Sequence, residues 1–468
     1  MTKIILILFI GLIMLFSCSR QKKDKEIESI ISKMTLKEKV DFIGGTNGFY
    51  IRGYDHLGIP EIRMADGPVG VRNPGPSTSF PASIALAASF DKKIAFEVGK
   101  AIGGEAKSKN VHIMLGPAMN IHRAPFCGRN FEYLGEDPFL AGKIAASYTK
   151  GMQGEGIIAT AKHYAANYQD FNRHLVSSNM DERTLHEIYL PAFKTTVQEG
   201  GVAAVMTSYN LINGVHASEH NYLNNEILKG KWKFDGFIMS DWVSTYNGIA
   251  CAKGGLDIEM PSGKYMAPDT LIPAIESGNL DVEVINDKIR RILGVYKRFG
   301  LLKNANIAQG YNVDLNYSKS VALEAARGGI VLLKNENGFL PVNKQNIKSV
   351  AIIGPNANPA ITGGGGSSFV NPLHAMSMPE AVKSVAGENV EIKYAKGVYT
   401  GERLPDGFFD EFNFYIKEDG VKKAGVKADF YKGIKLEGEV IASKTFDKLN
   451  LEKGNMADDA VPAEDFSA

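Results

Sequence analysis

The stretch "IIATAKHYAAN" (residues 157–167) is an apolar run that turns polar only near its end. Its hydrophobicity is too continuous for a strand with one solvent-exposed face and is typical of a parallel strand covered on both sides. The same character is found in "EIRMADGP" (61–68), "VHIMLGPAMN" (111–120), "VAAVMTSYN" (202–210), "GFIMSDW" (236–242) and "GLDIEMP" (255–261). The sequence therefore predicts a sheet of buried parallel strands.

Helical patterns separate these strands. Asp91 can cap a helix over residues 92–109, and a second pattern over residues 182–201 ends at Gly200-Gly201. Alternation of this kind over residues 25–305 matches the size of a (β/α)8 TIM-like barrel. The fold class expected is therefore α/β, although only six strands are clear and some barrel elements would be degenerate.

Polar side chains sit at the carboxyl ends of these runs. A barrel brings all such ends to one face, where active sites are found, so a shared pocket is expected. Separate helix caps are the alternative, but Lys and His are poor N-caps. The residues concerned are Asp66, Lys162, His163, Tyr209, Asp241 and Glu259.

The pattern changes after residue 305. Residues 306–322 are expected to be a linker, and residues 323–424 the first part of an α/β sandwich domain. Within it, residues 320–342 predict a helix, a strand and a turn. Strands "SVAIIGP" (349–355) and "VEIKYAKG" (390–397) then flank a helix at residues 379–387.

From residue 425 to residue 468 the chain has a period-two β pattern without helices, best seen in "VKADFYKGIKLEGEVIASKTF" (426–446). A β pattern that has scarcely begun cannot fill a core by residue 468. The expectation is that the chain stops inside this third domain.

The first residues, "MTKIILILFIGLIMLFSC" (1–18), predict an export signal. The apolar stretch is shorter than the ~20 residues that a transmembrane helix needs, and it fits a secretory signal peptide. "LFSC" resembles a bacterial lipobox, which would make Cys18 the lipidated first residue of a membrane-anchored lipoprotein, periplasmic or on the cell surface. A simple cleaved signal is the alternative, and both place the protein outside the cytoplasm.

Composition narrows the function classes. The net charge is +1 without basic clusters beyond the N-terminus, so no nucleic-acid partner is expected. No CxxC, HExxH or GxSxG motif occurs, so no metal site or serine triad is indicated, and no cofactor is expected. Cys127 and Cys251 could pair, but buried free thiols are favoured.

The glycine-rich stretch "TGGGGSSFVNP" (362–372) invites a nucleotide-binding interpretation. A phosphate loop leads from a strand straight into a helix N-terminus, whereas residues 356–361 intervene here and Pro372 follows. A surface loop, one that could face the barrel's pocket, is the favoured interpretation.

The strand-end residues suit carbohydrate chemistry. A carboxylate such as Asp241 can attack an anomeric carbon, while other charged groups hold sugar hydroxyls through charge-assisted hydrogen bonds. Trp242 and Tyr209 offer flat apolar faces for the C–H side of a pyranose ring. Core packing of Trp242 remains the alternative.

Seven blocks resemble the signatures of glycoside hydrolase family 3, in family order. They are "MADGPVGVR" (64–72), "GRNFEYLGEDPFLAG" (128–142), "AKHYAANYQD" (161–170), "MDERTLHEIYLPAF" (180–193), "VMTSYNLINGVHAS" (205–218), "GFIMSDWVST" (236–245) and "GLDIEMP" (255–261). "VLLKNENGFLPV", "AIIGPNA" and "GGGGSS" resemble the family's second domain, and the pattern from Val426 resembles a protective-antigen-type β-sandwich insert.

The resemblance implies roles for individual residues. Asp241 would be the catalytic nucleophile of a retaining, exo-acting β-glucosidase acting on β-linked oligosaccharides. The residues implied to bind or line the sugar subsite are Asp66, Arg129, Lys162, His163, Met206, Tyr209 and Trp242. "AANY" after the Lys-His pair favours the β-glucosidase branch over the N-acetylglucosaminidase branch, which has Pro-Gly-His-Gly.

The resemblance leaves the acid/base open. In members with an insert the acid/base Glu follows that insert, and no block of this chain matches it. Glu132 and Glu259 are expected to be supporting or structural residues. A β-xylosidase or another glycosidase of the family is one alternative, and a carbohydrate-binding fragment without the acid/base is another.

Overall fold

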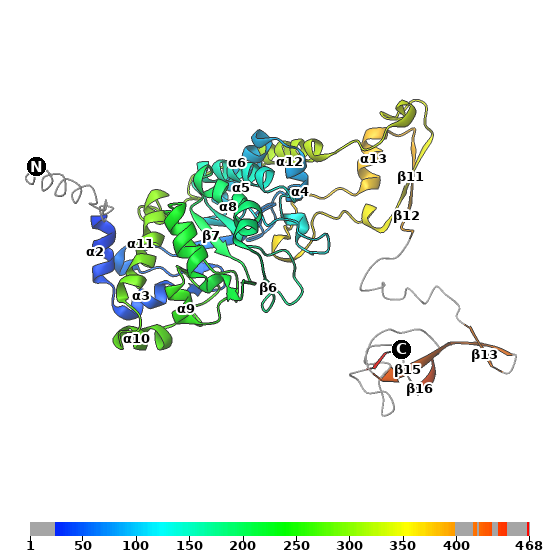
Figure 1. The fold of residues 1–468 in the computed structure, drawn as a ribbon. Helices are drawn as coiled ribbons and strands as arrows, with labels where there is room; N and C mark the ends of the chain where they lie inside the picture. The colour runs from blue at the N-terminus through cyan, green and yellow to red at the C-terminus, as the bar shows by residue number, and fades with distance from the viewer. Residues whose placement is uncertain (1–23, 398–414, 419–420, 433–438, 447–465, 468) are drawn as a thin grey trace, which may run out of the picture. The chain divides into compact units, whose positions relative to one another are not determined.

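The structure is a computed structural model that describes residues 24–397, 415–418, 421–432, 439–446 and 466–467. The predicted signal segment and its Cys18 lie outside these residues. The chain divides into two compact units (Figure 1). Unit 1 runs to Val342 and also takes in Thr362–Met376, and unit 2 comprises Asn343–Ile361 and the chain from Ser377 onward. Across the described ranges, no helix is both long enough and apolar enough to cross a bilayer.

A curled seven-stranded sheet organises unit 1. Its order is β1 (Gly45–Thr46), β2 (Tyr50–Ile51), β3 (Ile62–Asp66), β4 (Ile113–Leu115), β5 (Ile158–Tyr164), β7 (Ala204–Thr207) and β10 (Phe237–Met239). The five strands from β3 to β10 are parallel, as the apolar runs predict, whereas β1, β2 and β3 pair antiparallel.

The sixth predicted strand, at residues 255–261, is not a continuous strand. Ile258 bridges Met239 of β10, and Glu259 bridges Gly44 beside β1, so this segment joins the two edges of the sheet by isolated bridges. The described part of unit 1 is therefore α/β with a curled sheet, as expected, but the sheet has seven strands, joined by two antiparallel and four parallel pairings, in place of eight parallel strands.

Helices surround this sheet. They are α2 (Lys25–Lys33), α3 (Leu36–Phe42), α4 (Ser83–Ala88), α5 (Lys92–Ser108), α6 (Pro138–Gly154), α7 (Glu182–Thr184), α8 (Pro191–Gln198), α9 (Gly248–Lys253), α10 (Pro268–Glu276), α11 (Val282–Arg298) and α12 (Leu315–Gly329). Asp91 caps α5 as predicted, since its side chain accepts hydrogen bonds from the backbone of Lys93 and Ile94. The pattern at 182–201 is broken at Pro191, which begins α8, because proline cannot continue the preceding helical hydrogen bonds.

Shorter elements complete unit 1. β6 (Ser177–Ser178), β8 (Leu211–Ile212) and β9 (Val215–His216) form a small separate sheet. The short helices are η1 (Asp55–Leu57), η2 (Asn130–Glu132), η3 (Leu185–Tyr189), η4 (Ala217–Glu219), η5 (Tyr222–Lys231), η6 (Glu336–Gly338) and η8 (Gly366–Ser368).

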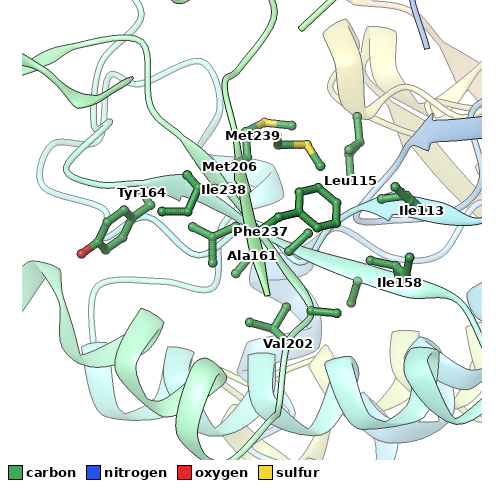
Figure 2. Packing of buried hydrophobic residues seen from close by; sticks show 14 of the residues in the cluster. Ile113, Leu115, Ile158, Ala161, Tyr164, Val202, Met206, Phe237, Ile238 and Met239 are labelled. Carbon is green, nitrogen blue, oxygen red and sulfur yellow. The ribbon is translucent and has the colours of Figure 1, made fainter. Parts of the chain in front are cut away.

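The core of unit 1 fills the space within and around the parallel strands (Figure 2). All seven residues of β5 are buried, and so are all residues of β4, β7 and β10. Helices α6 and α8 pack against β5, and α5 packs against α6. Burial on both faces explains why these strands are apolar throughout. Polar side chains that could act on a ligand are therefore found at the carboxyl ends of these strands.

The predicted boundary between linker and second domain falls inside α12. This helix spans residues 322 and 323 and packs against α4 and α5, with Val321 and Ala325 buried. The strand predicted after it is absent. Residues 330–335 form no strand, and the side chains of Ile330 and Leu333 are exposed. Apolar composition predicted a strand there, but no neighbouring strand pairs with the segment.

Residues Thr362–Met376, here called the strap, belong to unit 1 although the flanking residues do not. Ser77 forms a parallel bridge with Pro372: its N–H donates to Asn371 O at 2.9 Å and its carbonyl accepts from Leu373 N at 3.0 Å. Val370 is buried. The strap carries the tetraglycine stretch and η8, and it therefore lies against the sheet-bearing unit.

Unit 2 contains the predicted second α/β region. β11 (Ser349–Ile353) and β12 (Glu391–Ala395) pair in parallel, and α13 (Met378–Ala386) precedes β12, which confirms three predicted elements. The short helix η7 (Pro355–Ala357) follows β11. The period-two pattern forms β15 (Val426–Lys432) paired antiparallel with β16 (Val440–Phe446). β13 (Tyr415–Glu418), β14 (Val421–Ala424) and β17 (Phe466–Ser467) are the remaining strands.

Candidate active site

Polar strand ends converge on one cavity of about 430 Å³ in unit 1. Asp66 ends β3, Lys162 and His163 lie in β5, Tyr209 follows β7, and Asp241 follows β10. The lining residues are Phe49, Asp66, Arg72, Gly128, Arg129, Phe131, Glu132, Lys162, His163, Asp170, Arg173, Met206, Tyr209, Asp241, Trp242 and Gly364–Ser368. Every predicted sugar-binding residue is in this set, and so is the predicted nucleophile.

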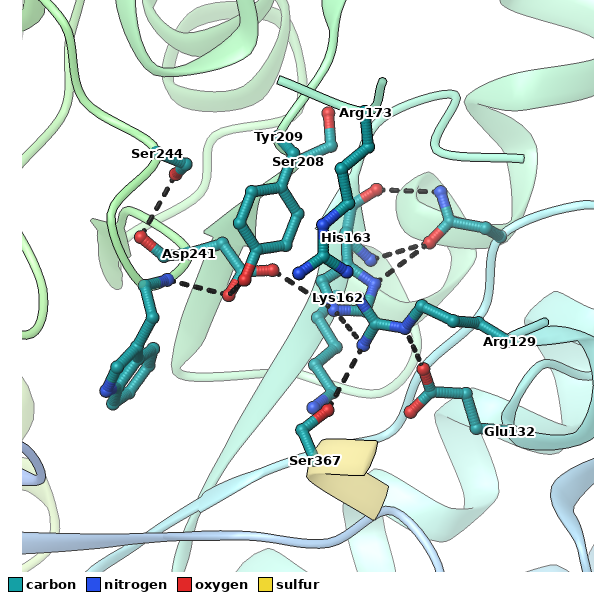
Figure 3. Close-up of polar contacts among 12 residues, drawn as sticks. Arg129, Glu132, Lys162, His163, Arg173, Ser208, Tyr209, Asp241, Ser244 and Ser367 are labelled. Carbon is teal, nitrogen blue, oxygen red and sulfur yellow. Dashed lines mark hydrogen bonds and ion pairs between the residues drawn. The ribbon is translucent and has the colours of Figure 1, made fainter. Parts of the chain in front are cut away.

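Asp241 is buried and has two inequivalent oxygens (Figure 3). Oδ1 accepts hydrogen bonds from the Tyr209 hydroxyl at 2.8 Å and from the Trp242 backbone N–H at 2.7 Å. Oδ2 has no hydrogen-bond donor among the described residues. Burial raises the pKa of Asp241, while Arg129 and Lys162 counteract that rise. One oxygen is thus fixed, and the other is left for a partner that enters the cavity.

His163 is held neutral beside this carboxylate. Burial, together with Arg129 and Lys162, lowers the pKa of His163 well below its usual value. Its Nε2 accepts from Arg129 Nη2 at 2.8 Å, which places the ring proton on Nδ1, 3.3 Å from Asn120 Oδ1. The 3.4 Å contact between Nε2 and Asp241 Oδ2 is therefore no ion pair, because a neutral imidazole carries no charge.

Asp66 lies between two cations on the other side of the cavity. Lys162 Nζ is 3.6 Å from Asp66 Oδ1, and Arg72 Nη1 is 3.6 Å from Oδ2. Burial raises the pKa of Asp66, and the charge of Lys162 opposes that shift. These distances are longer than direct hydrogen bonds, so the polar atoms keep bonding capacity for sugar hydroxyls.

Aromatic side chains form one wall. The Arg173 guanidinium lies 4.0 Å from the centre of the Tyr209 ring, on the ring face. Trp242 packs on Phe49 with ring centres 5.0 Å apart, and its Nε1 donates to Gly48 O at 2.9 Å. Trp242 is only partly buried and lines the cavity, so it combines packing with a face open to the pocket, and the core alternative is not needed.

The two glutamates expected to be supporting residues have their carboxylates occupied. Glu259 accepts from Thr245 Oγ1 at 2.8 Å and from the backbone N–H groups of residues 264–266. It holds a loop and does not line the cavity, so only four of the five predicted strand ends reach it. Glu132 lines the cavity but pairs with Arg129 and Ser368.

The tetraglycine stretch faces the cavity through Gly364–Ser368. Gly364 lies so close to the Phe131 ring that a Cβ at this position would come within 2.5 Å of it. Arg129 Nη2 donates weakly to Ser367 Oγ at 3.5 Å. This confirms the prediction of a loop that faces the pocket, and the glycine at 364 is explained by close approach.

Several cavity residues were not predicted. Asp170 and Arg173, which pair at 3.4 Å, follow the strand end at Lys162 and His163 by a few residues. Asp170 is the last residue of the "AKHYAANYQD" block, which was a signal available in the sequence, whereas Arg173 lies just beyond that block. Phe49, Arg72, Phe131 and Ser367 carry no strand-end signal, because loops and the strap bring them in.

Cys127 and Cys251 are both buried and free, as expected. A larger, open groove of about 650 Å³ in unit 2 is lined mainly by Lys348, Glu380, Lys383, Glu388 and Glu391. The groove lies at the amino ends of β11 and β12, and none of the carboxylates that line it is buried, so the cavity of unit 1 is the better candidate for chemistry.

The sequence matches the models of one known protein family over two ranges. Residues 23–295 match the glycosyl hydrolase family 3 N terminal domain, and residues 330–461 match the C-terminal domain of the same family. The chain belongs to glycosyl hydrolase family 3. The strand-end cavity lies in unit 1, and unit 1 contains the whole match to the family's N-terminal domain.

Individual family 3 relatives are β-glucosidases. The chain is 39% identical to Beta-glucosidase B of Emericella nidulans over 83% of this chain and 47% of that protein. It is 37% identical to Thermostable beta-glucosidase B of Acetivibrio thermocellus over 91% of this chain and 56% of that protein. The chain thus spans about half the length of the curated relatives it matches.

Solved structures agree with the family 3 assignment. DesR, a β-glucosidase from Streptomyces venezuelae in complex with D-glucose, has a TM-score of 0.77 at 33% identity, over 91% of this chain and 60% of that one. β-Glucosidase 3B from Thermotoga neapolitana in complex with glycerol has a TM-score of 0.74 at 35% identity, over 78% of this chain and 55% of that one.

Proposed function

We propose that this protein is a retaining, exo-acting β-glucosidase that removes terminal non-reducing β-D-glucosyl residues from oligosaccharides. The observation that carries the proposal is the carboxylate of Asp241. One oxygen accepts two hydrogen bonds, and the other has no hydrogen-bond donor within the described part of the chain, in a cavity lined by charged groups and aromatic rings. The β-glucosidase names of the relatives support the choice of sugar.

In the proposed first step an Asp241 oxygen attacks the anomeric carbon. A glycosyl–aspartate bond forms, the glycosidic C–O bond breaks, and the leaving oxygen takes a proton from a general acid. Water then attacks the anomeric carbon and gives one proton back to the conjugate base of that acid, while the bond from the anomeric carbon to Asp241 breaks and the carboxylate is restored. Arg129, Lys162 and Asp66 would hold the sugar hydroxyls, and Trp242 and Met206 would pack against its apolar face.

No acid is assigned among the described glutamates at the cavity. Glu132 is engaged by Arg129 and Ser368, and Arg129 holds the pKa of Glu132 below its usual value although burial opposes this. An ionised, doubly engaged carboxylate has no proton to give. The resemblance to family members with an insert places the acid/base in a later block, and that placement stays a prediction.

Covalent trapping tests the nucleophile. A 2-fluoro β-glucoside with a good leaving group is expected to add one glycosyl unit to the chain, located at Asp241 by peptide mass spectrometry. Asp241→Ala should abolish labelling, whereas Asp170→Asn, a matched change of another cavity carboxylate, should leave the label on Asp241. Labelling that persists elsewhere in Asp241→Ala would refute the assignment.

Leaving-group dependence separates the complete enzyme from a sugar-binding fragment without an acid/base. A nitrophenyl β-glucoside scarcely needs protonation, whereas cellobiose does. Turnover of both substrates by the 468-residue chain would show that the acid lies within it. Turnover of the aryl glucoside alone would favour the incomplete alternative, and faster turnover of the aryl β-xyloside than of the β-glucoside would favour a β-xylosidase.

We also propose export as a lipoprotein anchored through Cys18, on the strength of residues 1–18 alone. Expression in a bacterial host with labelled palmitate tests it. The label should enter the wild-type protein in the membrane fraction and be lost in Cys18→Ser. A soluble, unlabelled wild-type protein with residues 1–18 removed would indicate a simple cleaved signal.

A further inference from the structure

Glu132 joins two segments that lie far apart in the chain. It ends η2 and is almost fully buried, with 1% of its surface exposed. Its Oε1 accepts a hydrogen bond from Arg129 Nε, and its Oε2 accepts one from Ser368 Oγ, 236 residues later in the strap. Each oxygen therefore has its own partner, Arg129 of the cavity lining for Oε1 and Ser368 of the strap for Oε2.

Arg129 has three hydrogen-bond contacts among the described residues, one of them with Glu132. The other two depend on how its guanidinium is oriented. Besides Glu132, its guanidinium donates to His163 Nε2 at 2.8 Å and to Ser367 Oγ of the strap at 3.5 Å (Figure 3). A planar guanidinium held at Nε by Glu132 and at Nη2 by His163 is restricted in orientation at two points. Glu132 therefore helps to set the direction in which the Nη groups face the cavity.

The strap has separate attachments away from Arg129. Ser77 pairs with the backbone at residues 371–373, and Ser79 Oγ donates to Thr362 O at 3.0 Å. Val370 packs at Gly70, where a Cβ would come within 3.1 Å of it. These contacts hold both ends of the strap, so the Ser368 contact can be removed without releasing it.

Burial makes the Ser368 hydrogen bond consequential. If Ser368 is removed, Glu132 Oε2 is left buried without its donor, which costs more than the loss of an exposed hydrogen bond. The carboxylate can recover a partner by turning toward another N–H of Arg129, the cation already bound to its other oxygen. That turn would rotate the guanidinium away from His163.

We propose that Glu132 is a positioning residue that couples the seating of the strap, through Ser368, to the orientation of Arg129. The orientation of Arg129 in the sugar site then depends on the Ser368 contact, and not on the attachments of the strap at Thr362 and residues 371–373. The proposal rests on the proposed function for the identity of the sugar. The coupling between the two segments is a separate claim that can fail or hold by itself.

The experiment combines hydrogen–deuterium exchange with glucose affinity, measured on the full 468-residue chain. Exchange is followed in peptides covering residues 127–133 and 362–376, and affinity by calorimetry. Ser368→Ala should speed exchange in both peptides and weaken glucose binding about tenfold, since a hydrogen bond to a charged group is lost. Ser368→Thr keeps the hydroxyl and should restore both readouts.

Ser79→Ala is the matched control because it loosens the strap away from Glu132. It should speed exchange in residues 362–376 only and leave glucose affinity unchanged. If Ser368→Ala folds poorly, Glu132→Gln takes its place. This variant keeps the shape of Glu132 and loses its charge, so it should speed exchange in both peptides and weaken glucose binding.

The proposal is overturned if Ser368→Ala affects only the strap peptide, or if Ser79→Ala weakens glucose binding as much as Ser368→Ala does. A wild-type chain that binds no glucose would refute the proposed function. Exchange in residues 127–133 would still decide the coupling in that case.

Discussion

Tyr209 fixes one oxygen of Asp241 and is itself backed by Arg173 on its ring face. The hydroxyl hydrogen bond stabilises the ionised carboxylate, so it lowers the pKa of Asp241 against the rise that burial causes. At the scale of single residues, the proposed role of Asp241 as nucleophile thus requires that a buried carboxylate stays charged. Arg129, Lys162, Tyr209 and the Trp242 N–H share that task.

Tyr209→Phe should therefore move the acidic limb of the pH–rate profile to higher pH. Loss of the hydroxyl raises the pKa of Asp241, so the carboxylate that we propose as the nucleophile becomes protonated, and activity is lost, at a higher pH than in the wild type. At neutral pH we expect kcat/KM for a nitrophenyl β-glucoside to fall about tenfold or more. Tyr246→Phe, which removes a hydroxyl outside the cavity lining, should leave the limb in place. An unmoved limb in Tyr209→Phe would contradict the role given to this hydrogen bond.

Lys288 is a buried lysine on the core side of α11. Its Nζ donates to Ala252 O at 2.8 Å, at the end of α9, and burial with the nearby Lys229 lowers its pKa from 10.5 to about 7. Between these values the unfolded chain holds a proton that the folded chain has released. Stability should therefore rise with pH from about 7 toward 10.5, and the full penalty should be present below about 7.

Lys288→Met should flatten this dependence. We expect the free energy of unfolding of the wild type to rise between neutral and alkaline pH more steeply than that of the variant, by at most about 1.4 kcal/mol per pH unit. Denaturant titrations over that range measure the difference. Lys150→Met, at an exposed position, is the control and should keep the wild-type slope. Parallel slopes for wild type and Lys288→Met would show that the lysine stays charged in the folded state.

At the scale of elements, α5 and α6 cross at glycines. A Cβ at Gly99 would lie 2.0 Å from Tyr148 O, and one at Gly151 would lie 2.0 Å from Phe96 O, so the two backbones touch. This contact places α6 over β5, the strand that carries Lys162 and His163. Helix spacing at these glycines therefore bears on the position of the site.

Gly99→Ala should destabilise unit 1 by about 1–3 kcal/mol, because the helices must separate to admit the methyl group. Gly294→Ala in α11 is the matched control. No atom lies within 4 Å of the added Cβ there, so the higher helix propensity of alanine should stabilise the protein by about 0.5–1 kcal/mol. Denaturant unfolding measures both. Stabilisation by Gly99→Ala, or destabilisation by Gly294→Ala, would contradict the packing argument.

At the scale of the whole molecule, the two units differ in how much they bury. Unit 1 contains a continuous apolar core, whereas the buried apolar side chains described in unit 2 are Val390 and Phe430. β11 and β12 alternate between exposed and half-buried residues without a buried one. Little of the stabilisation that apolar burial provides is present in the described part of unit 2.

Hydrogen exchange should reveal this difference. Amides of β11 and β12 are expected to exchange within minutes through local opening, while those of β5 and β7 should stay protected for hours. The full chain is labelled for set times and then digested, and mass spectrometry of the peptides measures both sets of amides in one sample. Equal protection of the two sets would show that unit 2 draws stability from contacts other than apolar burial.

The sequence alone determined the local features of this protein. Continuous apolar runs predicted β3, β4, β5, β7 and β10 because buried parallel strands need apolar residues on both faces. A polar residue at the end of such a run stands out, so sequence patterning singled out Asp66, Lys162, His163, Tyr209 and Asp241, which line the cavity, together with Glu259, which does not. For the tetraglycine loop, local context disfavoured a phosphate site, while its position at the pocket was only one possibility until the structure showed it.

Only the tertiary structure decided which distant segments meet. Ser368 lies 236 residues from Glu132, and no local pattern records their contact. The same holds for the bridges that Ile258 and Glu259 make to both sheet edges, and for the exposure of the apolar run after α12. Propensity and periodicity act over a few residues. Pairing, closure and burial depend on which surfaces are present to be covered, and that is a property of the folded chain.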